Sequence, residues 1–209
     1  MLSNTSDPRR PWLIAAALAL IGGLLWTGAH TSDRLTWLLE VFPVLIALPL
    51  LAATQRRYPL TTLLYTLIFF HAIVLMIGGQ YTYAEVPAGF WVRDWLDLTR
   101  NPYDKLGHFM QGFVPALIAR EILLRGGHVR GPGMLAFLTL CVVLAISASY
   151  ELIEWAAALI LGQGADEFLG TQGDPWDTQS DMAFAVFGGM LSLALFSRMQ
   201  DRQIGRLPR

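Results

Sequence analysis

Charged residues are scarce in this chain. Only 15% of its 209 residues are Asp, Glu, Lys or Arg, whereas soluble domains carry about 25%. Hydrophobic residues make up 54% of the sequence. A surface that faces water on all sides cannot be built from this composition, so we expect lipid to take the place of water over much of it. The composition predicts an integral membrane protein and excludes an ordinary soluble domain.

Cysteine is almost absent, because Cys141 is the only one in the sequence. A single thiol excludes an intramolecular disulfide, a redox pair and a thiolate metal cluster. Cys141 lies within an apolar run, where we expect it in the helix packing or on the lipid-facing surface. The sequence also lacks the HExxH motif of zinc peptidases, the GxSxG nucleophile elbow and the Walker A loop. These absences exclude several common classes of hydrolase.

Apolar stretches are what the chain has in abundance, and each is long enough to cross about 30 Å of hydrocarbon as a helix. They cover residues 12–29, 35–53, 60–79, 106–124, 134–161 and 182–199. We expect an all-α polytopic membrane bundle of six transmembrane helices, forming a single domain over residues 1–209. The longer connection after the third stretch leaves room for a short interfacial helix.

The basic residues favour one orientation, because Lys and Arg near short loops stay on the cytoplasmic side of the membrane. With six spans and a cytoplasmic N-terminus, four basic residues fall outside, namely Arg34, Arg93, Arg100 and Lys105. The other eleven fall inside, namely Arg9, Arg10, Arg56, Arg57, Arg120, Arg125, Arg130, Arg198, Arg202, Arg206 and Arg209. This bias predicts a multi-pass protein of a bacterial-type inner membrane with both termini in the cytoplasm.

Polar residues occur on one face of the fourth and fifth predicted helices. Asp104, His108 and Gln111 are spaced four and three apart, which places them on a common face. Glu151 and Glu154 are three apart in the next helix. An ionisable side chain within a span costs about 2.5 to 3.5 kcal/mol, so we expect these groups to face the bundle interior, water or a counter-charge. They predict a functional site. The alternative is that both glutamates only pair with neighbouring Lys105 or His108 and hold helices together, or that the fifth helix is long enough to place both at the membrane interface.

The start of the sixth helix carries three acidic residues. The order Asp174, Pro175, Trp176, Asp177 predicts Asp174 at the N-cap, proline at the first helical position and an acid in the first turn. Capping and the helix dipole could account for Asp174 and Asp177 without chemistry. Asp181 lies one turn beyond Asp177 on the same face, so we expect it to point toward the same outer cavity as Asp104.

Two further polar residues, Glu40 and His71, stand alone in or near the second and third predicted spans. A lone histidine on an apolar helix is more often a satisfied core residue than a ligand. We interpret His71 in that way.

Long motifs in the second half of the chain carry a family resemblance. They are YDKLGHF at 103–109 with QGFVPA at 111–116, YELIEW at 150–155 and GQGADEFLGTQGDPWDTQ at 162–179. This pattern closely resembles the YjdF family of bacterial inner-membrane proteins. The match covers roughly residues 101–189, and the first three helices agree mainly in hydropathy. The resemblance implies a small multi-span inner-membrane protein and a location, without an activity.

A more distant pattern is similar to the VanZ-like membrane proteins. It consists of Asp104-Lys105 with His108-Phe109, a glutamate-bearing helix, and Asp181 with Gly188. Two features of that family differ here, because Ala185 replaces an asparagine and neither Gln172 nor Gly173 supplies its arginine. The resemblance implies a shared architecture and a shared candidate site, and drug resistance is not carried over.

Together these residues predict an outward-facing acidic cavity that binds a divalent metal or an envelope substrate. The predicted metal ligands are Asp104, His108, Glu151, Glu154, Asp177 and Asp181. One imidazole with several carboxylates suits Mg, Mn, Ca or Fe. The predicted substrate-binding residues are Asp104, Lys105, Gln111, Glu154, Gln172 and Asp174. If the protein is an enzyme, His108 or Glu151 would be the catalytic residue that moves a proton on a lipid-linked envelope molecule.

Two alternatives stay open. In a small ion- or proton-coupled transporter, Glu151, Glu154 and His71 would relay protons or hold an ion within the bundle. The inner half, which is nearly free of acids in this interpretation, weighs against it. In a non-catalytic membrane factor the polar cluster would be structural. The expected partners are membrane lipids and not nucleic acid, since the C-terminal arginines suit an anionic inner leaflet.

Overall fold

The computed structural model describes residues 7–161 and 172–207, and these ranges are helical apart from short connections. The helices are α1 (Arg10–His30), α2 (Arg34–Thr54), α3 (Thr62–Tyr81), α4 (Pro87–Trp95), α5 (Tyr103–Arg125), α6 (Pro132–Leu161) and α8 (Asp177–Ile204). No strand occurs in these two ranges. The predicted all-α class is confirmed.

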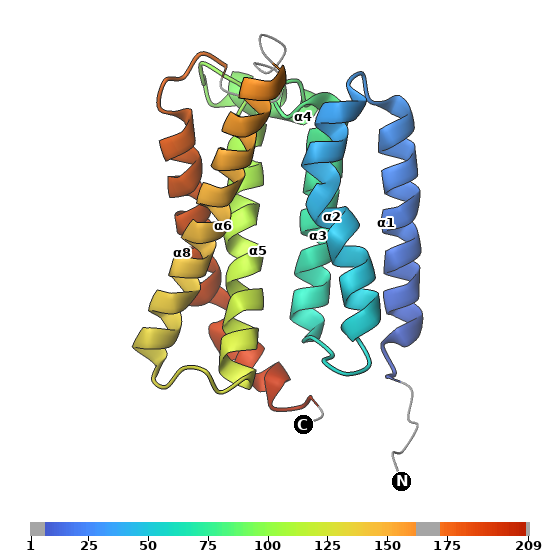
Figure 1. Ribbon diagram of the computed structural model, residues 1–209, viewed down its shortest axis with the longest axis vertical. Coiled ribbons are helices and arrows are strands. Elements are labelled where there is room, and N and C mark those ends of the chain that lie inside the picture. The colour runs from blue at the N-terminus through green and yellow to red at the C-terminus, as the bar shows by residue number, and fades with distance from the viewer. Residues whose placement is uncertain (1–6, 162–171, 208–209) are drawn as a thin grey trace.

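The long helices form a bundle with two halves (Figure 1). α1, α2 and α3 make one half, and α5, α6 and α8 make the other, while α4 lies across one end. Successive long helices run in opposite directions, so α1 begins and α8 ends at the end of the bundle away from α4. α4 is the short helix that the sequence allowed between the third and fourth spans.

Among the described residues, five helices are long and apolar enough to cross a membrane, namely α1, α2, α3, α6 and α8. α5 is not among them. It is more polar than a lipid-facing helix, and five of its 23 residues are charged: Asp104, Lys105, Arg120, Glu121 and Arg125. It would still reach about 34 Å. α5 packs against α3, α6 and α8, so protein surrounds much of it and a lipid-facing composition is not required. The chain is a multi-span helical membrane protein with five apolar candidate spans.

The predicted N-cap of the last helix is wrong. α8 begins at Asp177 with Trp176 at the N-cap, two residues later than an N-cap at Asp174 would place it. The Asp174 side chain instead accepts a hydrogen bond from the backbone N–H of Trp176 at 2.9 Å. An aspartate before proline can close a local turn of this kind instead of capping a helix. Asp177 does lie in the first turn, as predicted.

Glycines allow α5 and α8 to touch backbone to backbone. A Cβ atom on Gly112 would collide with the carbonyl oxygen of Ala185, and one on Gly188 would collide with that of Phe109. Small residues permit such close approach between membrane helices, where packing replaces the hydrophobic effect as the main source of association. This contact holds the polar residues at the start of α5 beside those at the start of α8.

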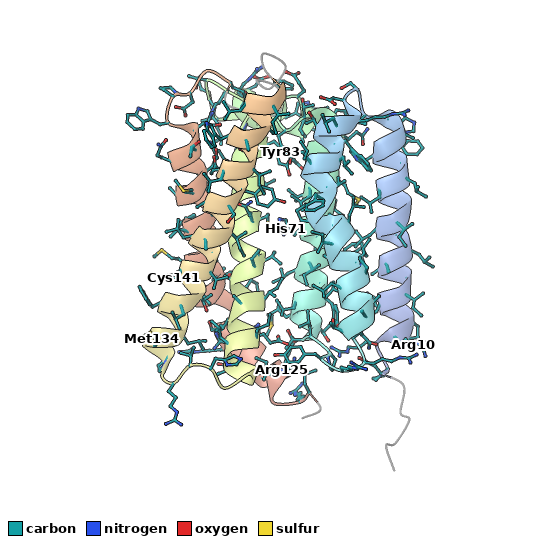
Figure 2. The ribbon with its side chains drawn as sticks, viewed as in Figure 1. Arg10, His71, Tyr83, Arg125, Met134 and Cys141 are labelled. Carbon is teal, nitrogen blue, oxygen red and sulfur yellow. The ribbon has the colours of Figure 1, made fainter. Side chains whose placement is uncertain are left out.

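Tyr83 joins the two halves near the end that carries α4 (Figure 2). It follows α3 with a φ of 42°, a left-handed backbone conformation that residues other than glycine seldom adopt. Its ring packs where Gly78 of α3 and Gly107 of α5 leave space, since a Cβ on either glycine would collide with it. Burial raises the pKa of the Tyr83 phenol well above its ordinary value, so the hydroxyl stays protonated.

Cys141 is exposed on α6, on the outer surface of the bundle (Figure 2). That position agrees with the lipid-facing alternative for this residue.

Candidate cation site and polar cavity

Asp104, His108 and Asp181 converge at the end of the bundle that carries α4. His108 Nε2 lies 3.5 Å from Asp104 Oδ1 and 3.8 Å from Asp181 Oδ1. One potential ligand atom from each residue lies within 4.8 Å of the other two. Asp104 and His108 are one turn apart on α5, and Asp181 comes from α8 across the glycine contact. All three are buried, with 8%, 7% and 2% of their surfaces exposed.

Several buried polar atoms around this triad have no hydrogen-bond partner within the described residues. They are Asp104 Oδ2, His108 Nδ1 and Glu151 Oε1. His108 Nδ1 and Glu151 Oε1 lie 3.8 Å apart, close enough for charge attraction and too far for a hydrogen bond. An unpartnered buried polar atom costs about 1 to 3 kcal/mol, and native proteins seldom tolerate one without a bound water, ion or ligand. The geometry therefore has unused capacity to bind something.

Two basic side chains pair with three acids at this end, including Asp181 of the triad. Lys105 Nζ donates to Asp181 Oδ1 at 2.5 Å and to Asp177 Oδ1 at 2.7 Å. Arg100 donates to Asp177 Oδ1 at 2.6 Å and pairs with Asp174 Oδ2 at 3.3 Å. Burial alone would lower the pKa of Arg100, but the hydrogen bond and charge of Asp177 raise it above its ordinary value. Asp177 is thus held by two cations.

The predicted substrate-binding residue Gln172 is used within the protein. Its side-chain oxygen accepts from the backbone N–H of Asn101 at 3.0 Å, and its amide donates to the Asn101 carbonyl at 3.0 Å. The Asn101 side chain in turn donates to the carbonyls of Ala84 and Val86 and accepts from the N–H of Tyr103. These bonds connect the segments before α4, α5 and α8, so Gln172 contributes to the frame around the triad.

A polar cavity of about 100 Å3 adjoins the triad, between the two halves of the bundle. Its polar lining comes from α2, α3, α5, α6 and the segment after α3, and consists of Glu40, His71, Tyr83, Asp104, His108, Gln111, Tyr150 and Glu154. A cavity of this size holds several water molecules. Figure 2 shows His71 between the halves, roughly midway along the bundle. The predicted common face of Asp104, His108 and Gln111 therefore opens into one space.

The interpretation of His71 as a satisfied core residue is wrong for its Nε2 atom. That atom is buried and has no hydrogen-bond partner in the described part of the chain, and the same holds for Gln111 Oε1. Glu40 is not isolated either, because it lines the same cavity. Sequence reasoning missed this because both residues are single polar positions in apolar helices. It did not assign Tyr83 or Tyr150 to the site, although Tyr150 begins the YELIEW motif, since a tyrosine alone gives no indication that it lines a cavity.

Comparison with known proteins identifies the family. The model of a family described as "Predicted membrane protein (DUF2238)" matches residues 12–202. The chain is 64% identical over 194 residues to the inner membrane protein YjdF of Escherichia coli (strain K12), which covers 93% of each chain. The chain belongs to the YjdF family of membrane proteins. The predicted resemblance is confirmed, whereas the likeness to VanZ-like proteins stays a prediction. No solved structure matches.

In this YjdF-family protein, three of the six predicted metal ligands converge. Asp104, His108 and Asp181 form the triad, Glu151 lies beside His108, and Glu154 lines the cavity with Gln111. Asp177 and Asp174 lie at the rim and pair with Arg100 and Lys105. The structure thus separates a rim that is already paired from an inner group in which Asp104, His108 and Glu151 have atoms without a hydrogen-bond partner within the described residues. Asp181 belongs to the inner group and also pairs with Lys105.

A second buried polar cluster lies at the opposite end of α5 and α8, and sequence analysis overlooked it. Glu121 is completely buried. One carboxylate oxygen accepts from the Thr61 N–H at 3.2 Å and from Arg125 at 2.9 Å. The other accepts from the Thr61 hydroxyl at 2.9 Å and from Gln200 at 3.3 Å. In the predicted orientation this end is the inner one. The expectation that the inner half is nearly free of acids therefore needs correction, because Glu121 is a buried carboxylate with both oxygens bonded.

Proposed function

We propose that this protein binds one divalent cation through Asp104, His108 and Asp181 on the outer side of a bacterial inner membrane. The convergence of three buried ligand atoms within 4.8 Å supports this proposal. Asp104 Oδ2 and His108 Nδ1, which make no hydrogen bond within the described residues, add to it. Two carboxylates and one imidazole favour Mg, Mn, Ca or Fe over a thiolate-seeking ion.

The proposed orientation has six spans, both termini in the cytoplasm and a single domain over residues 1–209. α5 is the sixth span, carried across the membrane inside the bundle by its contacts with α3, α6 and α8. Six alternating helices bring the start of α1 and the end of α8 to one side. Ten of the fourteen Lys and Arg residues within the described ranges lie on that side, which the positive-inside rule assigns to the cytoplasm. The triad then faces outward.

The cavity next to the triad is where we place the polar group of an envelope substrate, such as the hydroxyl or cationic group of a lipid-linked molecule. Gln111 and Glu154 line it and supply acceptors. A bound cation would polarise a substrate oxygen or a water molecule there. Glu151 lies beside the proposed ligand His108 and has an unpartnered oxygen, so it is the group that would accept a proton.

Transport is the weaker candidate. The cavity reaches His71 and Pro115 within the bundle, but Glu121, the buried acid at the opposite end, is not part of its lining. Both oxygens of Glu121 are engaged in hydrogen bonds with neighbouring groups. A carboxylate held in this way is poorly suited to pass an ion onward. A purely structural cluster is also disfavoured, because structural clusters have their buried polar atoms paired.

The metal content of the detergent-purified protein, measured by mass spectrometry after exposure to a mixture of divalent cations, tests the proposal. We expect about one equivalent in the wild type and a loss of that equivalent in His108→Ala and Asp181→Asn. Asp201→Asn is the matched control, because Asp201 is an α8 acid that pairs with Arg120 far from the triad. Absence of metal in the wild type, or equal loss in the control, would refute the proposal.

A further inference from the structure

A second hollow lies in the other half of the bundle, between α1, α2 and α3. Its volume is about 400 Å3, four times that of the polar cavity. Its walls are mainly apolar, with Leu13, Ala17, Leu20, Leu48, Ile68 and Phe69 among the lining residues. It opens toward the outside of the bundle and shares no lining residue with the polar cavity. An apolar groove on the flank of a membrane helix bundle faces lipid chains.

The groove occupies one half of the membrane thickness. Along α1 its lining runs from Arg10 to Leu20, which corresponds to about 15 Å of helix. The hydrocarbon core of a bilayer is about 30 Å thick. On α2 the lining begins at Leu48 and continues past the helix end to Arg56, so both helices place the groove in the same half. These dimensions suit the acyl chain of a lipid in one leaflet of the bilayer.

Positive charge is concentrated at the end of the groove that lies at the membrane surface. Arg10 and Arg56 line it there together with Gln55. Within the described residues neither guanidinium takes part in an ion pair or hydrogen bond. The neighbouring Arg9 differs, because it pairs with Asp7 and donates to the Leu60 carbonyl. Arg9 therefore serves the fold, whereas Arg10 and Arg56 remain available to a ligand.

We propose that this groove binds an anionic phospholipid. One acyl chain lies along the apolar walls, and Arg10 and Arg56 hold the phosphate of the headgroup. Basic pockets between membrane helices on the cytoplasmic side bind anionic headgroups in this way. In the orientation proposed above, the lipid belongs to the inner leaflet. The site is separate from the cation triad, and its lipid preference does not depend on metal binding.

Native mass spectrometry of the full-length protein in detergent tests this site. The probes are phosphatidylglycerol and phosphatidylcholine with identical acyl chains. We expect the wild type to bind the anionic lipid about thirtyfold more tightly, given the attraction of two arginines. The double variant Arg10→Gln/Arg56→Gln is expected to lose that preference. Arg57→Gln is the matched control, because Arg57 is exposed, adjacent in sequence and outside the groove lining.

Two more variants separate the headgroup from the acyl chain. Ala17→Leu places a larger side chain in the groove. It should reduce the occupancy of both lipids about equally, since the leucine takes space that the acyl chain would occupy. Arg10→Lys/Arg56→Lys keeps the charge and should retain most of the preference, which also guards against a folding defect in the glutamine variant. Equal binding of both lipids by the wild type, or an effect of Arg57→Gln as large as that of the double variant, would overturn the proposal. The proposal would also be overturned if the wild type formed a dimer in place of a lipid complex and Ala17→Leu abolished that dimer.

Discussion

α5 and α8 carry one buried polar cluster at each end, and the two clusters differ in how they are satisfied. At one end Glu121 has both oxygens bonded to Thr61, Arg125 and Gln200. At the other end Asp104, His108 and Glu151 retain buried atoms without a hydrogen-bond partner among the described residues. The same pair of helices therefore supports a saturated network and an unsaturated one.

The difference indicates different roles. A buried charge stabilises a protein only where its hydrogen bonds and counter-charge are in place, so a saturated cluster suits helix association. An unsaturated cluster costs stability that the rest of the bundle must offset. Such a cost persists where function requires open ligand positions. We assign the Glu121 cluster to the fold and the His108 cluster to binding.

The largest effect is expected from a change at the backbone contact between α5 and α8, because both clusters depend on it. Gly112→Leu would drive a side chain into the Ala185 backbone and separate α5 from α8. We expect the loss of monodisperse folded protein, because overpacking at a backbone contact has no room to relax. Size-exclusion chromatography in detergent checks this. Gly22→Leu is the control, since nothing lies within 4 Å of a Cβ at that glycine. A folded Gly112→Leu protein would contradict the packing described here.

Removing the saturated carboxylate comes next. Glu121→Ala leaves Arg125 and Gln200 without their buried acceptor, and breaking a buried pair in this way costs about 3 to 5 kcal/mol. The unfolding free energy in a denaturing-detergent titration measures the loss. Asp201→Ala should change it little, since the Asp201 side chain is half exposed and such pairs contribute about 0 to 1 kcal/mol. A Glu121→Ala protein as stable as the wild type would refute the structural role of this cluster.

The unsaturated cluster should respond in the opposite way. Asp181→Asn should weaken Mn2+ binding by about a hundredfold or more. Loss of a residue that only hydrogen-bonds to a metal ligand already weakens binding by about 10- to 100-fold, and loss of a ligand itself is at least as severe. Its unfolding free energy in metal-free buffer should stay within about 1 kcal/mol of the wild type, since one of several crowded acids is neutralised and Lys105 keeps its pair with Asp177. Titration followed by electron paramagnetic resonance, with the unfolding assay in parallel, gives both values. A large loss of stability with unchanged affinity would move this cluster into the structural class.

A smaller effect is expected from the lysine that competes with the cation. Lys105 Nζ lies 2.5 Å from Asp181 Oδ1, so a cation must displace it or share that oxygen. Lys105→Met should tighten Mn2+ binding about tenfold, since a nearby positive charge at an effective dielectric constant of about 20 opposes the ion by more than 1 kcal/mol. The same titration measures it. Weaker binding in Lys105→Met would show that Lys105 supports the ligand instead of competing with it.

Much of the fold could be predicted because the lipid solvent constrains it. Apolar runs located six of the helices, and their bounds shifted by a few residues where polar ends continue the helix. α8, for example, extends from Asp177 to Ile204, beyond the apolar run at 182–199. The helical spacing of Asp104 and His108 placed them on one face, and the spacing of Asp177 and Asp181 brought the second helix to the same end.

The contacts between distant helices could not be predicted. Glu40 and His71 belong to the half opposite His108, and no single-sequence pattern relates one half to the other. The Glu121 network was missed for the same reason, because two of its partners, Thr61 and Gln200, lie 60 and 79 positions away in the sequence. The turn at Asp174 was misjudged because its side chain can cap a helix or close a turn, and only the surrounding structure decides.

The central claim is that His108 is a cation ligand, and pulsed electron paramagnetic resonance of the Mn2+-loaded protein tests it most directly. A coordinated imidazole gives a nitrogen modulation in the spin echo. We predict this modulation in the wild type and in His71→Ala, because His71 is not part of the triad, and its absence in His108→Ala. A wild type without nitrogen modulation, or a modulation that His71→Ala abolishes and His108→Ala retains, would contradict the account.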